Sequence, residues 1–274
     1  MLPRLRRLSD GRPLLRTDSF KLAEDAPEAL LRSGRAGYYA IISYFDDKLG
    51  RLLDCLEETG QRENTIVVYV SDHGEMAGEH GMWRKSNMYE ASARVPLQIS
   101  WPAQPSLVQP GRRCAAVTST VDLIATLLEL CNIDGEGLPP LDGHSLAPLM
   151  LSDAPADPTA AGWKDEALCE YLAHGVISPN AMLRVGKYKL MYSHGDQPAL
   201  FDVVDDPDEL HDLAQDPQHA ETLAKLSKRL VEVWGEPAEI ERQVRASQVA
   251  RQCIADAAAG GSAGRRGRGG AARL

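Results

Sequence analysis

Hydrophobic residues between positions 33 and 58 recur mostly three or four residues apart. They are Tyr38, Ile41, Ile42, Phe45, Leu49, Leu52, Leu53 and Leu56. This spacing predicts an amphipathic helix over 33–58, with Gly60 in the place of a C-terminal cap. A similar pattern predicts a second helix over 121–131, with Thr118 or Ser119 as its N-cap.

Two short apolar runs in the same half of the chain predict β-strands. The run TIVVYV at 65–70 is β-branched and lacks polar alternation, which is typical of a buried strand. The run VPLQISW at 95–101 follows Arg94 and stops before Pro102. The order helix, strand, strand, helix therefore predicts one edge of a layered α/β sheet with flanking helices.

The pattern changes after the loose stretch SDAPADPTAAG, and we place a domain boundary near 152–165. Beyond it, a strand is predicted at 167–171. A hairpin turning at Gly186-Lys187 and a short strand in ALFDVV follow. A small antiparallel sheet closed by helices over about 219–234 and 238–256 is expected. The predicted units are 1–152, 153–256 and a disordered Gly/Ala/Arg-rich tail, 257–274.

Composition narrows the classes of function. The chain has 274 residues and a formal net charge of −9, which argues against general nucleic-acid binding. No apolar run approaches the roughly 18 residues that span a bilayer, so no membrane segment is expected. The five cysteines form no CxxC pair and are odd in number, which favours the reducing cytoplasm over a disulfide framework.

The sequence Asp72-His73-Gly74 begins one residue after the predicted strand at 65–70. In open α/β sheets, ligands bind at the carboxyl ends of strands. A carboxylate beside an imidazole provides half of a shell for a divalent cation, and Gly74 permits a sharp turn and a close ligand approach. In the alternative interpretation, Asp72 caps the next element and His73 is a turn residue. The spacing alone leaves both open.

Lys85, in GMWRKSNMYE, is a candidate to clamp an anionic substrate or to stabilise charge on a leaving oxygen. The alternatives are a solvated surface lysine or a role for its neighbour Arg84. Glu170 and Tyr171 end a predicted strand, where an acid and a ring can hold a cationic group; a buried tyrosine paired with an acid is the alternative. We interpret His80 as structural and expect an ion pair between Glu90 and Arg94.

Three separated motifs, spanning about 36–215, resemble the sulfatase family of the alkaline-phosphatase superfamily. They are the stretch from SYFDDKLGRLLDCLEE through SDHGEMAGEHGMWRKSNMYEASARVPLQISWP, then VTSTVDLIATLLELCNI with LDGHSLAPL, and then MLRVGKYKLMYSHGDQPALFDVVDDPDELHDLA. Within the family, GMWRKSNMYEASARVPL, EYLAHGVISPNAMLRVGKYKLMYS and EIERQVRASQVARQCIADA are most similar to the choline-sulfatase branch.

The resemblance implies a partial sulfatase-like α/β sheet followed by a small antiparallel subdomain, and an activity of hydrolysing choline sulfate, a small-molecule sulfate ester. By this match Asp72 and His73 bind a divalent metal, Lys85 contacts the sulfate and the leaving oxygen, and Glu170 holds the trimethylammonium group. Ca²⁺ is the expected metal, with Mn²⁺ or Mg²⁺ as alternatives. A phosphonate or phosphodiester hydrolase of the same superfamily is the rival enzyme.

The sequence also departs from the family pattern. Sulfatases carry a Cys/Ser-x-Pro/Ala-x-Arg motif whose Cys or Ser becomes formylglycine, and none of the cysteines at 55, 114, 131, 169 and 253 lies in one. The family's opening strand of metal ligands and its histidine-bearing middle are also absent. We therefore expect the C-terminal part of a sulfatase, from a truncated gene, a misassigned start or a split protein, inactive alone. A non-catalytic remnant is the alternative, forming a homo-oligomer or joining an N-terminal half or an intact sulfatase.

Overall fold

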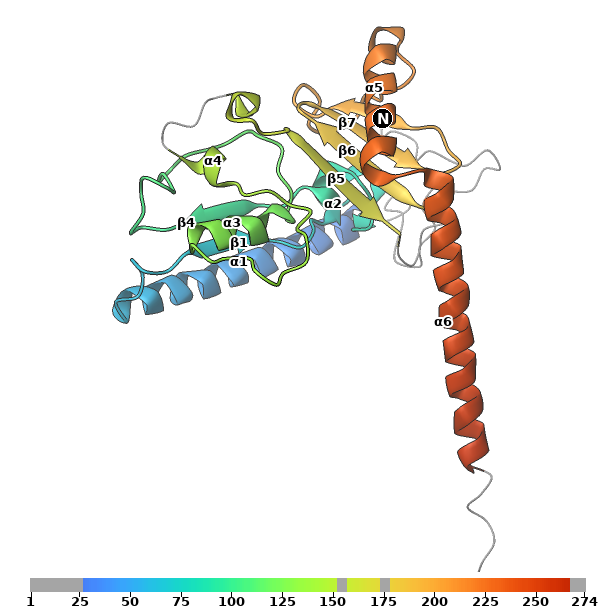
Figure 1. Ribbon diagram of the computed structural model, residues 1–274, viewed down its shortest axis with the longest axis horizontal. Helices are drawn as coiled ribbons and strands as arrows, with labels where there is room; N and C mark the ends of the chain where they lie inside the picture. The colour runs from blue at the N-terminus through green and yellow to red at the C-terminus, as the bar shows by residue number, and fades with distance from the viewer. Residues whose placement is uncertain (1–26, 152–156, 173–177, 267–274) are drawn as a thin grey trace, which may run out of the picture.

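The computed structural model describes residues 27–151, 157–172 and 178–266 (Figure 1). The first element is the long helix α1, Glu28–Glu58. Its C-cap is Thr59, and the predicted cap residue Gly60 follows one position later, with a φ of 65° and its N–H donated to the Glu57 carbonyl at 3.0 Å. The predicted apolar stripe is present, but no α1 side chain is buried: Ile41 is 66% exposed and Leu52 64%.

Two strands lie beside α1 in Figure 1, β1 (Val67–Val70) and β4 (Leu97–Ser100). They pair antiparallel in the register Val68↔Ile99, as a two-stranded sheet within the described residues. The prediction of a buried strand is wrong, because β1 is only half-buried and Val70 is 39% exposed. A pair of strands offers too little surface to cover both of its own faces.

A small hairpin and a short helix follow β1. The hairpin strands are β2 (Met76–Ala77) and β3 (Trp83–Arg84), joined through the 3₁₀ turn η2 (Glu79–Gly81) and followed by α2 (Glu90–Ala93). The start of α1 fastens this hairpin, since Arg35 Nε donates to the Ala77 carbonyl at 2.6 Å. Gly34 meets the Trp83 ring so closely that a Cβ there would lie 2.8 Å from it.

The two segments of the second family-like motif, VTSTVDLIATLLELCNI and LDGHSLAPL, meet at α3 (Asp122–Leu130), which precedes α4 (Ala147–Met150). The buried Asp122 carboxylate accepts the N–H groups of Ser119 at 2.8 Å and His144 at 2.9 Å. Thr118 and Ser119 do not cap this helix with their side chains, so that prediction is wrong. The Asp122 carboxylate instead binds the backbone of both segments and joins the loop at 144 to α3.

The C-terminal part contains a four-stranded antiparallel sheet in the order β5-β6-β7-β8. The strands are β5 (Glu166–Tyr171), β6 (Asn180–Val185), β7 (Tyr188–Ser193) and β8 (Ala199–Asp202). The short η3 (Pro158–Ala161) precedes the sheet and η4 (Pro217–His219) follows it. The predicted hairpin is confirmed: Val185 pairs with Tyr188 across a turn in which Gly186 has a φ of 53°.

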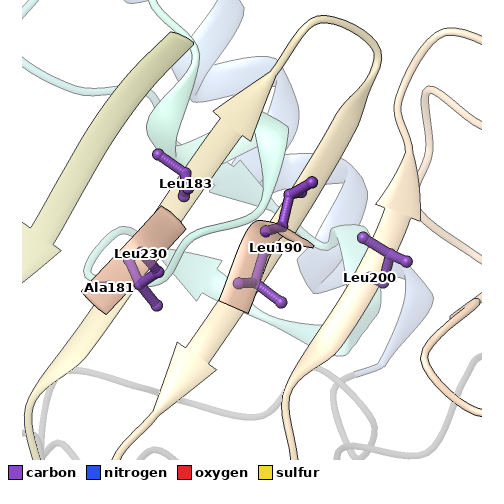
Figure 2. Packing of buried hydrophobic residues seen from close by; sticks show 6 residues of the cluster. Ala181, Leu183, Leu190, Leu200 and Leu230 are labelled. Atoms are coloured by element: carbon purple, nitrogen blue, oxygen red, sulfur yellow. The ribbon is translucent and has the colours of Figure 1, made fainter. Parts of the chain in front are cut away.

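Helix α5 (Ala220–Trp234) covers one face of this sheet, and α6 (Pro237–Arg266) projects away from it (Figure 1). Strand and helix side chains interdigitate in the core shown in Figure 2, formed by Ala181, Leu183, Leu190, Leu200, Leu226 and Leu230. Helix α6 continues through 257, where the sequence predicted a disordered tail to begin, and residues 267–274 of that tail lie outside the described residues. Among the described residues, no helix is long and apolar enough to cross a membrane.

Candidate functional site

The candidate site begins where β1 ends. The turn after Val70 is held by local hydrogen bonds, from Ser71 Oγ to the His73 carbonyl at 2.8 Å and from His73 N–H to Asp72 Oδ1 at 3.0 Å. The Asp72 side chain is 82% exposed and that of His73 35%. Both residues therefore present polar atoms at the rim of the molecule.

The hydrogen bonds of His73 determine which ring nitrogen is free to bind. Its Nδ1 lies 2.8 Å from the Gly74 carbonyl, which can only accept, so Nδ1 carries a proton and Nε2 is the nitrogen left for other partners. That Nε2 lies 3.3 Å from Asp72 Oδ2. Desolvation favours the neutral acid, but His73, the nearby backbone N–H groups and Lys85 outweigh it and lower the pKa of Asp72. The Asp72 carboxylate and His73 Nε2 thus lie next to each other at the end of β1.

Lys85 completes this group of three. It directly follows β3, and its Nζ lies 2.5 Å from His73 Nε2. Its two neighbours, Arg84 and Ser86, both have a φ of 75°, an uncommon value for residues other than glycine. Backbone strain of this kind clusters at functional sites. The structure therefore brings together the three residues that the sequence singled out, with the lysine ammonium at the imidazole lone pair.

The structural reason for a glycine at position 74 differs from the expected one. It is not among the glycines with positive φ, so no left-handed turn requires it. Instead, a Cβ at this position would lie 2.1 Å from the Ala91 carbonyl oxygen, and the Gly74 N–H donates to the Ser92 carbonyl at 2.8 Å. Close contact with α2 explains the glycine. The site turn is thereby fixed against that helix.

His80 is structural in this fold, as the sequence suggested. Its ring is buried and stacks on Tyr89 with centroids 3.8 Å apart. Burial lowers the pKa of His80, against smaller contributions from Asp208 and Glu79 that raise it. A neutral ring in this layer supports the loop that carries Lys85.

Glu170 lies in a separate group of side chains. It is the penultimate residue of β5 and accepts a hydrogen bond from Trp234 Nε1 at 2.7 Å, and the Trp234 ring meets Tyr192 edge-on with centroids 6.0 Å apart. Among the described residues, no recorded contact connects Glu170 to Asp72, His73 or Lys85. The substrate-binding role of Glu170 stays a prediction.

Sequence reasoning missed a buried ion network behind the site. The predicted pair of Glu90 with Arg94 exists at 4.0 Å, but Arg94 is mostly exposed. Glu90 makes a closer contact with Lys189 Nζ, at 2.9 Å, and Lys189 also lies 2.7 Å from Glu209. The sequence feature that could have indicated this network is the alternation of the side chains of YKLMYS between the two faces of the strand. Tyr188, Leu190 and Tyr192 pack toward α5, so Lys189 points to the opposite face.

The donor set at Asp72 and His73 fits half of a metal shell. Within the described part of the chain, no cluster of three or more His, Cys, Asp or Glu side chains is arranged to hold a metal ion. The pair supplies one oxygen and one nitrogen, which suit a hard divalent cation when oxygen ligands come from elsewhere.

Comparison with known proteins gives the family. The family model described as N-sulphoglucosamine sulphohydrolase, C-terminal, matches residues 78–236, and the model described as Sulfatase matches residues 13–133. The chain belongs to the sulfatase family. Its fold is a mixed α/β fold with a small antiparallel sheet of four strands, and it is similar to a solved putative sulfatase from Bacteroides thetaiotaomicron VPI-5482, with a TM-score of 0.64 at 25% identity.

Individual relatives are similar over most of this chain. Choline-sulfatase of Rhizobium meliloti (strain 1021) is 36% identical over 242 residues, covering 87% of this chain and 44% of that protein. Arylsulfatase K of Gallus gallus is 35% identical over 206 residues, covering 73% and 37% respectively. The crystal structure of phosphonate monoester hydrolase of Agrobacterium radiobacter has a TM-score of 0.65 at 29% identity, covering 76% of this chain and 42% of that one. The chain spans less than half the length of these relatives.

Proposed function

We propose that this chain carries the metal- and anion-binding half of a sulfuric ester hydrolase site, with choline sulfate as the substrate. One observation carries the proposal: Asp72, His73 and Lys85 converge at the end of β1, with Lys85 Nζ 2.5 Å from His73 Nε2. The similarity to choline-sulfatase supports the choice of substrate.

Asp72 Oδ2 and His73 Nε2 are the atoms that would hold a divalent cation, which would replace the Lys85 ammonium as the partner of the Nε2 lone pair. Ca²⁺ is the expected ion, and the single imidazole leaves Mn²⁺ and Mg²⁺ as alternatives. Such a cation supplies Lewis-acid stabilisation of sulfate oxygens. The bond from His73 Nδ1 to the Gly74 carbonyl keeps the ring turned with its lone pair outward, as the hydrogen-bonded second nitrogen of a metal-binding histidine does.

Lys85 binds the anionic end of the substrate. Its ammonium stabilises the negative charge that develops on the leaving oxygen, and that stabilisation is larger in the transition state than in the ground state. Glu170, beside Trp234, is proposed to bind the cationic end through its carboxylate. These residues supply no covalent nucleophile, and the five cysteines lie outside the formylglycine motif. We therefore expect the chain alone not to hydrolyse choline sulfate.

Binding of Mn²⁺ by the full 274-residue chain tests the metal pair directly. Titration followed by electron paramagnetic resonance should show one site, and Asp72→Asn should weaken it about tenfold or more, because it replaces an anionic ligand by a neutral one. Asp54→Asn, an exposed change on α1, is the matched control and should leave the affinity unchanged. Equal affinity in all three proteins would contradict the assignment.

The activity test supplies the missing part of the site, which carries the nucleophile. The chain is co-expressed with the N-terminal half of the Rhizobium meliloti choline-sulfatase, and choline sulfate hydrolysis is measured. Lys85→Met should lower kcat/KM by about a hundredfold or more, whereas Arg84→Met should have little effect. The reverse result would assign the anion contact to Arg84. Turnover by the chain alone would disprove its expected inactivity.

A phosphonate monoester hydrolase is the second candidate, favoured by the TM-score of 0.65 to such an enzyme. Both activities need the same metal pair and lysine, so the site alone does not separate them. Measuring kcat/KM for choline sulfate and for a phenyl phosphonate ester on the same co-expressed preparation does. A higher value for the phosphonate would replace the proposed substrate and keep the proposed site.

A further inference from the structure

We propose that Lys189, in the C-terminal sheet, is a positioning residue for the Asp72-His73 turn. The proposal deepens the proposed function and relies on it for what the turn does. Lys189 is on β7 and its side chain is 0% exposed, although no catalytic role requires a lysine there. Buried lysines are uncommon and need partners. Its partners connect it to the site.

The first link joins Lys189 to α2. Its Nζ lies 2.9 Å from Glu90 Oε1 and 2.7 Å from Glu209 Oε1. Glu209 Oε2 accepts the backbone N–H of Glu90 at 2.6 Å, and Arg184 Nη1 lies 3.4 Å from Glu90 Oε2. The first residue of α2 is thus held by both its backbone and its side chain. Lys189 is the cation common to the two carboxylates.

The second link joins α2 to the turn. Gly74 N–H donates to the Ser92 carbonyl of α2, and the Ala91 carbonyl occupies the space that a side chain at 74 would need. Gly74 in turn supplies the carbonyl that orients His73. A shift of α2 would therefore move the acceptor of Gly74 and release the imidazole orientation. In the part of the chain that the structure describes, the contacts that lead from Lys189 to His73 run through α2, so Lys189 acts by position.

Glu209 adopts an unfavourable backbone conformation in this ion network. It has a φ of 53°, which is unfavourable for a residue with a side chain. Burial raises the pKa of Glu209, and the Lys189 charge opposes that shift. Its side chain reaches both Lys189 and the start of α2 from this conformation. The strained backbone of Glu209 is offset because its carboxylate binds both Lys189 and the backbone N–H of Glu90.

Hydrogen exchange of backbone amides in the full chain tests the proposal without requiring metal or substrate. Lys189→Met should speed exchange of the Gly74 amide by about tenfold or more relative to the Leu213 amide, because opening of α2 becomes a separate local event. Leu213 donates to the Leu200 carbonyl at 2.8 Å within the C-terminal part and reports its general stability. Lys187→Met is the matched control. It removes a lysine on the same hairpin that pairs with Asp202 and Asp205 instead.

A second variant separates positioning from simple loss of stability. Combining Lys189→Met with Glu90→Gln and Glu209→Gln removes the unpaired buried charges, so the melting temperature should recover toward that of the wild type. Exchange at Gly74 should remain fast in this triple variant. A change at Gly74 that only follows the change at Leu213 in both variants would overturn the proposal.

Mn²⁺ titration of the same proteins distinguishes this proposal from the proposed function. Weaker binding in Lys189→Met, with unchanged binding in Lys187→Met, supports both. Wild-type binding that depends on Asp72 but not on Lys189, with Gly74 exchange also unchanged, overturns the positioning role alone. If the wild type binds no Mn²⁺ while Gly74 exchange responds to Lys189→Met, the proposed metal site fails and the positioning of the turn stands.

Discussion

The N-terminal and C-terminal parts of this chain both combine strands with an amphipathic helix, but they differ in how far their apolar side chains are buried. The four-stranded sheet places Leu190 and Leu200 at 0% exposure beneath α5. In the N-terminal part, β1 has one strand partner among the described residues, and Ile41 and Leu52 of α1 are exposed. The candidate site lies in the less buried part. Lys189, which comes from the better packed part, pairs with Glu90 at the start of α2, the helix that the site turn contacts.

The difference has a simple physical origin. A sheet of four strands with a helix across it removes enough apolar area from water to form a core, at about 25 cal/mol per Å². A pair of strands beside one helix leaves apolar surface and two open strand edges. A polar site at a strand end does not need a large core of its own, provided that a neighbouring core holds its backbone.

The largest effect is expected from truncating one leucine in each part. Leu190→Ala should lower the free energy of unfolding by about 3 to 4 kcal/mol, because it opens a cavity in a closed core. Leu52→Ala should change it by about 0.5 kcal/mol or less, because Leu52 is already exposed. Urea unfolding followed by tryptophan fluorescence measures both. Similar losses would show that α1 is packed in solution and that the two parts do not differ.

A smaller effect is expected from acid. Arg229 binds Glu166 through Nε at 2.9 Å and Nη2 at 2.5 Å, and this hydrogen-bonded pair lowers the pKa of Glu166 from its ordinary 4.5 despite partial burial. The native state therefore binds fewer protons at this site than the unfolded state. The stabilisation is complete above about pH 4.5 and is lost as the pH falls through the lower folded value. Screening limits it to about 1 kcal/mol or less.

Arg229→Met should remove this dependence, so its melting temperature should fall less between pH 6 and pH 3.5 than that of the wild type (a window set by the roughly 4.5 pKa of a free glutamate). Lys225→Met is the matched control on the same helix. It breaks a pair that also lowers the pKa of Glu221, but both side chains are more than two-thirds exposed, so solvent screens the pair and the response to acid should be smaller. The prediction fails if both variants respond to acid alike.

The smallest effect on stability, and a clear effect on association, is expected at the apolar face of α1. Because Ile41 and Leu52 are exposed, the chain should self-associate as its concentration rises. The double variant Ile41→Glu, Leu52→Glu should shift size-exclusion chromatography toward the monomer while changing stability by about 0.5 kcal/mol or less. Ala40→Glu places the same charge on the opposite face and should leave association unchanged. A wild-type chain that is monomeric at every concentration would contradict the prediction.

Much of the local structure was predictable from the sequence. The spacing of hydrophobic residues by three and four predicted α1, and Gly186-Lys187 predicted the turn between β6 and β7. The position after a predicted strand indicated Asp72 and His73 as candidate site residues. These features depend on residues that are close along the chain. The convergence of Lys85 on His73 was anticipated from the family resemblance, since twelve positions of sequence separate the two and no local rule places them together.

The periods of the helices and strands, the turn residues and the family motifs can all be recognised in the amino-acid sequence, because each depends on neighbouring side chains and backbone preferences. Tertiary structure alone decided that β1 is half-buried, that Gly74 is required by the Ala91 carbonyl, and that Lys189 pairs with Glu90. Burial and ion pairing depend on which distant elements meet. A lysine 99 residues along the chain from its partner carboxylate gives no local sign of that contact.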